Sequence, residues 1–142
     1  MKESMQAMLI PRFGGPEVLS RGTVPIPRPG PDDILLRVAA CGIDRKDLLI
    51  RDGTIRRKSS GYLAASSSTR ADVDLPLITG AEIAGAIAEV GTRITKFKAG
   101  DRVACLPRRG HCGICMYCRT GRSESCPDAY FIGHDVNGGY AE

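Results

Sequence analysis

The sequence predicts a mainly β fold, a small twisted barrel or sandwich with short helices. The 142 residues include 17 glycines and 9 prolines, which are spread out so that the apolar runs between them are short. Short apolar runs bounded by turn residues are typical of strands. Several such strands joined by Gly/Pro turns indicate a small barrel or sandwich. Residues 44–51 suit a short helix.

The first half of the chain supplies three expected strands. Ala7–Ile10 reads as the first, ended by the turn residues 14–16, and Val18–Ile26 as a looser second. The prolines at 25, 27, 29 and 31 then predict an extended connector, because proline cannot join a central ladder. Ile34–Cys41 (ILLRVAAC) is the clearest candidate for a buried strand.

A short helix is expected next, over Asp44–Arg51 (DRKDLLIR). Asp44 suits the N-cap position, and the helical period places Leu48 and Leu49 on the inward face. Residues 53–74 are rich in serine, arginine and small residues, and they predict a mobile surface loop that is a tolerated insertion.

The second half continues with strands at Ile83–Val90 and Arg102–Leu106, separated by turns at Gly91 and Gly100. The last five residues, GGYAE (138–142), are expected to begin one more strand. This arrangement of short strands agrees with the barrel or sandwich inferred from composition.

Composition indicates an ordinary globular chain. It is 42% apolar and 25% charged, with a mild net charge of +4. No apolar run is long enough for a membrane span, and the N-terminus lacks the apolar core of a signal peptide. We therefore expect a cytoplasmic location with reduced thiols, and neither a membrane nor a nucleic acid as partner. Cys41 and Cys105 lie in apolar runs and are expected as small buried core residues.

Four cysteines form a metal-binding pattern. The spacing is C-x2-C-x2-C-x7-C, through Cys112, Cys115, Cys118 and Cys126. Zinc suits four thiolates best, and a shell filled by protein leaves no open position for substrate. We therefore expect one structural Zn²⁺ per chain, with Gly113 and Gly121 giving the loop its positive φ angles. An iron–sulfur cluster and a pair of disulfides are the alternatives.

Six sequence motifs, in order, carry a resemblance to a known family. They are FGGPEVL (13–19), VAACGIDRKDLLIRDG (38–53), PLITGAEIAGAIAEVG (76–91), FKAGDRVA (97–104), the four-cysteine lobe (about 107–127) and GGYAE (138–142). Over residues 5–142 the chain resembles the N-terminal, GroES-like domain of the medium-chain dehydrogenase/reductases, which include zinc alcohol dehydrogenases and zinc-less quinone reductases. The resemblance implies a GroES-like twisted β-barrel whose four cysteines hold a structural zinc.

The chain departs from the family at the positions that hold a second, catalytic zinc. In the zinc-dependent members, one ligand is a cysteine three residues after the position of Cys41; in this chain that residue is Asp44. Two positions later, where those members have a hydroxyl residue that relays protons, this chain has Lys46. The G-H-E motif with its histidine ligand is here Gly80-Ala81-Glu82, and alanine has no donor atom. Asp47 matches both branches of the family. We therefore expect no standard catalytic zinc.

Three carboxylates, Asp44, Asp47 and Glu82, are the catalytic candidates, because the resemblance places them in the cleft between two domains. As a pair, Asp44 and Glu82 suit harder cations better than zinc. Structural roles stand beside these: a helix cap for Asp44, a hydrogen bond to the backbone for Asp47, and a buried paired carboxylate for Glu82.

Two basic residues, Lys46 and His134, also have alternative interpretations. Lys46 is interpreted as an exposed helix lysine, with pairing to a phosphate or an acidic substrate as the alternative. His134 is expected to be a polar surface residue on a loop, with a position in the cleft as the alternative.

The resemblance also implies a second, cofactor-binding domain that is not among these 142 residues. Family enzymes continue after the GGYAE segment into a Rossmann domain that binds NAD(P)H. Here Gly80, Gly85 and Gly91 lack G-x-G-x-x-G spacing, so no cofactor-binding residue is expected. We expect residues 1–142 to form one GroES-like domain without the Rossmann domain, either as a fragment or as a natural short product.

Two functions remain open at this point. The first is the substrate-side domain of an oxidoreductase that transfers hydride between NAD(P)H and an alcohol, carbonyl or activated alkene, inactive as an isolated chain. Its partner would be a small-molecule substrate. The second is a non-enzymatic, zinc-stabilised module that works by self-association or by binding a partner chain. A nucleic-acid role is not favoured, because no aromatic residues interleave with the arginines around the lobe.

Overall fold

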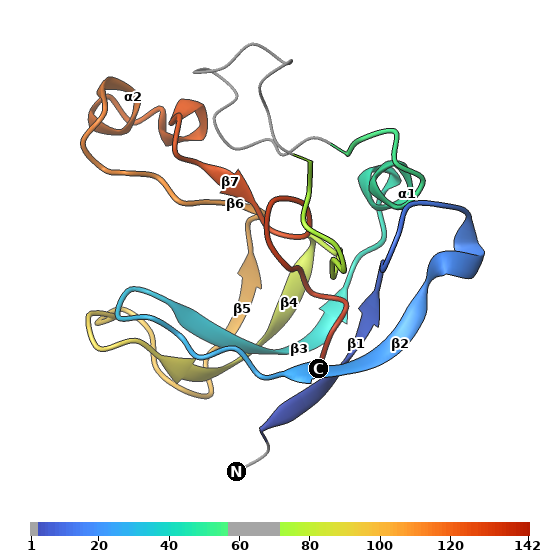
Figure 1. Cartoon of the computed structure of the whole chain (residues 1–142). Helices are drawn as coiled ribbons and strands as arrows, with labels where there is room; N and C mark the ends of the chain where they lie inside the picture. The colour runs from blue at the N-terminus through green and yellow to red at the C-terminus, as the bar shows by residue number, and fades with distance from the viewer. Residues whose placement is uncertain (1–2, 57–71) are drawn as a thin grey trace.

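The computed structural model describes residues 3–56 and 72–142, and in these ranges the chain is mainly β with short helices, as predicted (Figure 1). The elements are β1 (Ser4–Leu9), η1 (Pro16–Val18), β2 (Ser20–Pro25), β3 (Ile34–Cys41), α1 (Arg45–Arg51), β4 (Ile83–Val90), β5 (Arg102–Cys105), β6 (Arg108–Arg109), α2 (Met116–Arg119), η3 (Ser123–Ser125) and β7 (Tyr130–Phe131). Most of the loop expected at 53–74, residues 57–71, lies outside the described residues.

The named strands pair antiparallel in three sheets, β1–β2, β3–β4–β5 and β6–β7. The final residues extend the first sheet on the other side of β1. The Met8 N–H donates to the Tyr140 carbonyl at 2.8 Å, and Ala141 bridges Ala7. The strand expected to begin at 138–142 is therefore present as a short bridge.

The small residues of β4 allow a close approach to β3. A Cβ added at Gly85 would lie 2.1 Å from the carbonyl oxygen of Arg37, which is too close for any side chain. The register between the two strands shifts between Val38 and Ala40, beside this contact. A glycine is therefore required where β3 bulges against β4.

The buried face of α1 differs from the prediction. Ile50 is 1% exposed and packs with Val73 and Leu77, whereas Leu48 is 47% exposed and Leu49 is half-buried. The inward face thus carries Asp47 and Ile50, three residues apart, because Asp47 is held inside by hydrogen bonds described below. Leu48 follows Asp47 directly, so its side chain points about 100° away from that of Asp47 around the helix axis.

Three other expectations about the strands require correction. The second strand begins at Ser20, because Pro16–Val18 form a 3₁₀ turn that buries Val18. None of β3 is fully buried, and neither Cys41 nor Cys105 is a core residue, since each is only half-buried. The physical reason is that one face of the β3–β4–β5 sheet borders an open groove.

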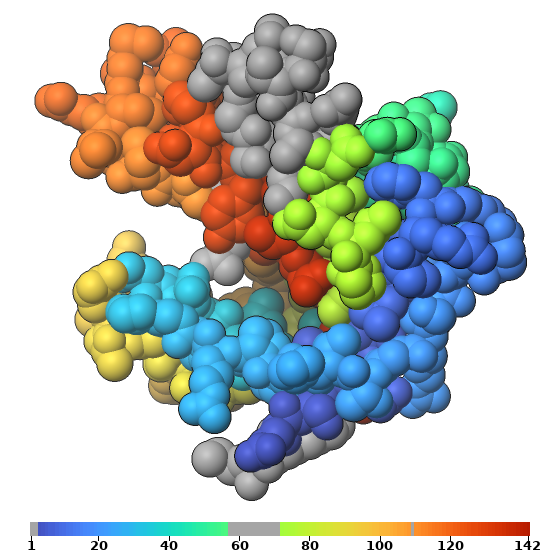
Figure 2. All heavy atoms as spheres, viewed as in Figure 1, coloured from blue at the N-terminus to red at the C-terminus, as the bar shows by residue number. Residues whose placement is uncertain are grey.

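This groove lies between the two larger sheets and has a volume of about 780 Å³. Met5 and Ile26 line it on one side, and Leu36, Val38 and Ala104 on the other. On the face seen in Figure 2, a hollow lies between the segments coloured cyan and yellow, which include β3, and those coloured orange and red. Among the described helices, none combines the length and the apolar character that a membrane span requires.

Candidate metal centre and neighbouring polar cluster

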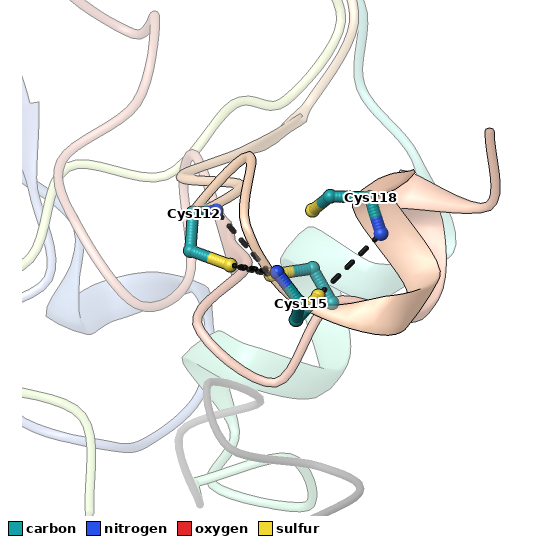
Figure 3. A group of neighbouring side chains, drawn as sticks. Cys112, Cys115 and Cys118 are labelled. Atoms are coloured by element: carbon teal, nitrogen blue, oxygen red, sulfur yellow. Dashed lines mark hydrogen bonds between the residues drawn. The ribbon is translucent and has the colours of Figure 1, made fainter. Parts of the chain in front are cut away.

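The four cysteine sulfurs converge as the spacing predicts. The thiols of Cys112, Cys115, Cys118 and Cys126 all lie within 4.8 Å of one another. Figure 3 shows the labelled sulfurs turned toward one another. The sulfurs of Cys112 and Cys126 are 3.7 Å apart. Tetrahedral zinc with Zn–S bonds of about 2.3 Å separates its sulfur ligands by roughly 3.8 Å, so this distance fits a shared ion.

Local backbone geometry preorganises the lobe. Cys115 caps α2, with its sulfur accepting from the Cys118 N–H, and the Cys115 N–H points at the Cys112 sulfur 3.3 Å away. Gly113 and Gly121 have φ angles of +76° and +75°, as predicted. Such N–H···S contacts stabilise thiolates, which is the form that binds a metal.

Without a cation, the proximity of the four thiols opposes their ionisation. Burial raises the pKa of Cys118 to about 12, while the hydrogen bond from the Cys112 N–H lowers the pKa of Cys126 to about 7. Four neighbouring thiols cannot all ionise unless a positive ion compensates them. The donor set therefore fits a structural zinc.

Other uses of the four cysteines fit less well. All six cysteines of the chain are free thiols, and the 3.7 Å between the Cys112 and Cys126 sulfurs is far longer than a disulfide bond of about 2.05 Å. In the described part of the chain, this is the one group of cysteines, histidines and carboxylates placed to share a metal ion.

Asp44 caps the first helix. Its carboxylate accepts from the N–H groups of Lys46 at 2.5 Å and Asp47 at 3.1 Å, and the Asp47 carboxylate accepts from the Asp44 N–H at 3.0 Å. This reciprocal capping box satisfies donors that the first turn leaves open. The structural role proposed for Asp44 is therefore confirmed.

Asp47 links three segments that are distant in sequence. It is 7% exposed, and its second oxygen accepts from the Gly80 N–H at 3.1 Å. The Tyr140 hydroxyl donates to the other Asp47 oxygen, Oδ2, at 2.6 Å and lies 3.0 Å from the Gly42 carbonyl oxygen. The hydrogen bond to the backbone expected for Asp47 is thus present, and a hydroxyl contact that the sequence reading missed accompanies it.

Gly80 adopts a conformation that only glycine tolerates at low cost. Its φ is +94°, and an added Cβ would lie 2.7 Å from both the Cys41 sulfur and the Tyr140 ring. The turn therefore brings the Gly80 N–H against Asp47. Beside it, burial, together with the carboxylates of Asp47 and Glu82, raises the pKa of the Cys41 thiol to about 11.

The third carboxylate candidate is not buried. Glu82 is exposed, and its side chain lies over Gly42, so the prediction of a buried paired carboxylate is wrong. The preceding Ala81 is 8% exposed and offers no donor atom. Glu82 immediately precedes β4, and the inward position at the start of that strand is taken by Ile83.

Two basic residues also differ from their predictions. His134 is 2% exposed, and its Nδ1 lies 3.7 Å from the buried Asp135 carboxylate, so it is not a surface residue. Lys46 is half-buried, with its ammonium 4.0 Å from the centre of the Phe131 ring. The sequence places Arg108 only among the basic residues that flank the cysteine lobe, and its contact with Phe131 was not predicted because β6 and β7 pair only in the fold.

A family model described as "Alcohol dehydrogenase GroES-like domain" matches residues 30–142. A curated relative from Sulfolobus acidocaldarius, called an NAD-dependent alcohol dehydrogenase, is 36% identical over 97% of this chain and 37% of its own length. The chain thus spans about a third of the length of the curated relatives it matches.

Solved structures agree with this match. The crystal structure of AibC has a TM-score of 0.83 and 37% identity, over 99% of this chain and 35% of that one. A cobalt- and zinc-bound alcohol dehydrogenase from Pyrobaculum aerophilum has a TM-score of 0.79 and 31% identity, over 98% of this chain and 38% of that one. The structural similarity therefore extends over almost all of this chain and over little more than a third of each solved chain.

Proposed function

The chain belongs to the alcohol dehydrogenase GroES-like domain family, and on that premise we propose that it is the substrate-side domain of an NAD(P)-dependent oxidoreductase. The substrate class would be a small alcohol, a carbonyl compound or an activated alkene. The match over residues 30–142, with relatives named as NAD-dependent alcohol dehydrogenases, is the observation that carries this proposal. Hydride transfer requires the nicotinamide to be held against the substrate.

The 142 residues contain no G-x-G-x-x-G fingerprint of their own. We therefore propose that the nicotinamide is bound by a separate domain and that residues 1–142, one GroES-like unit, do not turn over alone. The likeness to relatives about three times as long supports this. Six free cysteines support a reducing, cytoplasmic location.

We propose that Cys112, Cys115, Cys118 and Cys126 hold one structural zinc. When bound, the ion would cross-link the lobe between β6 and β7 and supply no reaction chemistry, because the cysteines fill its shell. A second zinc of the family type is not expected from these residues, since Ala81 lacks a donor and the Asp44 oxygens cap a helix.

Of the three carboxylates, we propose that Asp47 is a positioning residue. It fixes the Gly80 turn, the start of α1 and the Tyr140 ring around one buried point. Asp44 acts through the helix cap. Exposed Glu82 remains a candidate for contact with substrate.

The test is an assay of the protein isolated from its native source, combined with its intact mass. Oxidation of NADH or NADPH by aldehydes, ketones or enones, from a chain well above 15.2 kDa, is the expected result. Recombinant residues 1–142 should bind zinc and show no turnover. A native mass near 15.2 kDa without reductase activity would contradict the proposal.

A second candidate, a zinc-stabilised interaction module, is favoured by one observation. The open groove between the sheets is accompanied by exposed apolar side chains on and before the lobe, including Leu106 (82%), Ile114 (80%) and Met116 (62%). Apolar surface of this kind marks association with another chain or a second copy. Under this reading the native short chain would be found in a complex.

A further inference from the structure

Two cations meet on one aromatic ring beside the helix cap. The Lys46 ammonium lies 4.0 Å from the centre of the Phe131 ring, and the Arg108 guanidinium carbon lies 5.0 Å from the same centre. The three residues come from α1, β6 and β7, so the fold, and not local sequence, brings them together. Cation–π attraction accounts for their closeness to the ring and leaves their hydrogen-bond donors available.

Neither cation is in direct contact with a carboxylate within the residues that the structure describes. No side-chain hydrogen bond or ion pair of Lys46 or Arg108 occurs there, and both residues are half-buried. The Arg108 Nε is shielded from solvent without a hydrogen-bond acceptor. Lys46 is partly withdrawn from solvent, and this burial lowers its pKa. A half-buried charge of this kind gains strongly from an anion.

The nearby carboxylates are engaged elsewhere. Asp44 accepts from the first turn of α1, and Asp47 from Gly80, from the Asp44 N–H and from Tyr140. Asp135 accepts from the Phe131 N–H at 2.7 Å and lies 3.7 Å from His134. They raise the affinity of Lys46 for its proton without contacting the ammonium.

We infer that Lys46 and Arg108, gathered on the Phe131 ring, form a binding site for the carboxylate or phosphate group of a small molecule. The planar guanidinium suits either oxyanion, and the lysine supplies a compact second charge. The assignment of that anion to the substrate rests on the proposed function, because Lys46 lies between two of the catalytic candidates, Asp44 and Asp47. The binding itself does not depend on that function.

The test is an NMR titration of the zinc-loaded chain at constant ionic strength, with malonate and inorganic phosphate as separate probes and chloride as the reference anion. Shifts of the Phe131 ring and the Lys46 side-chain signals should saturate with at least one probe. Preference for malonate or phosphate identifies the class of anion. Lys46→Met and Arg108→Met should each weaken binding roughly tenfold, as expected for lost charged hydrogen bonds.

Arg45→Met is the matched control, since Arg45 is exposed on the same helix and its loss changes the net charge equally. It should leave the affinity within about twofold, and Lys46→Arg should retain binding, because both are expected to leave the site's charge intact. Equal weakening by Arg45→Met, or no saturation with either probe by a folded, zinc-loaded chain, would overturn the inference. Neither result bears on hydride transfer, so the proposed function is tested separately.

Discussion

At the scale of single residues, the buried Asp47 joins three segments of the chain. Replacing it by alanine leaves the Gly80 N–H, the Asp44 N–H and the Tyr140 hydroxyl without their acceptor. We expect Asp47→Ala to lower the free energy of unfolding by about 3 kcal/mol, measured by urea denaturation of the zinc-loaded chain.

Tyr140→Phe provides the comparison for Asp47→Ala. It removes one of the three contacts and leaves Asp47 bonded to two backbone N–H groups, so a loss of about 1 kcal/mol is expected. If both variants lost the same free energy, the backbone contacts of Asp47 would contribute nothing and its positioning role would be wrong.

The Cys41 thiol is expected to be unreactive. Its pKa is raised from 9.0 to about 11, so at pH 8 it holds about one hundredth of the thiolate of an unperturbed cysteine. Alkylation of Cys41 by iodoacetamide, followed by mass spectrometry of the digested chain, should be about 100-fold slower in the folded than in the urea-unfolded protein. Equal rates would show that burial does not protect the thiol.

The same shift has a consequence for stability against pH. The folded state keeps the Cys41 proton to a higher pH than the unfolded state does. Its stabilising contribution is therefore complete below pH 9 and is lost as the pH rises through about 11. Unfolding measured across this range should show a decline that Cys41→Ala reduces.

Residue types and spacing predicted some of these roles and not others. The four-cysteine spacing and the aspartate before a helix are local patterns, and both predictions were confirmed. The burial of His134 and the exposure of Glu82 depend on contacts across the fold, and both were predicted wrongly. Tyr140 reaches Asp47 across 93 positions, which no local pattern reveals.

At the scale of elements, the helix α1 depends on its cap. Asp44→Ala removes the acceptor for two N–H groups and should cost about 1 kcal/mol of stability, measured by thermal or urea unfolding. Asp44→Asn keeps an acceptor oxygen and should cost less. A loss from Asp44→Asn as large as that from alanine would indicate that charge, and not the capping hydrogen bond, matters.

The cysteine lobe, from β6 to β7, should depend on its ion. Chelation of zinc from the intact chain is expected to lower the melting temperature sharply, because four-thiolate sites in zinc peptides contribute roughly 10–16 kcal/mol of apparent binding free energy. Cys118→Ser should lose the zinc, measured by metal analysis of the purified protein, while Cys105→Ser should retain one ion per chain. An unchanged melt after verified zinc loss would argue against a structural ion.

Element boundaries were predictable where apolar runs end at turn residues. Ile34–Cys41 and Ile83–Val90 have the predicted limits as strands β3 and β4. The short hairpin β6–β7 and the helix α2 were missed, because two- and four-residue elements leave no periodicity to read. The predicted second strand began too early, at Val18, because Pro16–Val18 form a 3₁₀ turn and the strand starts at Ser20.

At the scale of the whole molecule, the groove between the two larger sheets is the feature most open to association. Its apolar lining, with Leu36 and Val38 on one wall, should bind an environment-sensitive dye and support self-association of residues 1–142. Val38→Glu should reduce both effects without changing zinc content, as measured by fluorescence and analytical ultracentrifugation. A monomeric wild-type chain that binds no dye would contradict this expectation.

The fold class was predictable from the frequency of glycine and proline, and the family resemblance gave its architecture. The division into three separate sheets was not predictable, because it depends on pairings between strands far apart in sequence. β1 pairs on one side with β2 and on the other with the last residues of the chain. That placement of residues 140–142 also leaves the groove open beside them.

Tyr140–Glu142 pair with β1, and the partners lie up to 136 positions apart in the sequence. During translation, at about 5–20 residues per second, the first strand leaves the ribosome on the order of ten seconds before this neighbour is made. One edge of β1 therefore stays unpaired in the nascent chain during this interval. An unpaired strand edge can bind a chaperone or pair with an incorrect strand. Slower synthesis near the C-terminus would lengthen that interval, and the yield of soluble protein should fall with it.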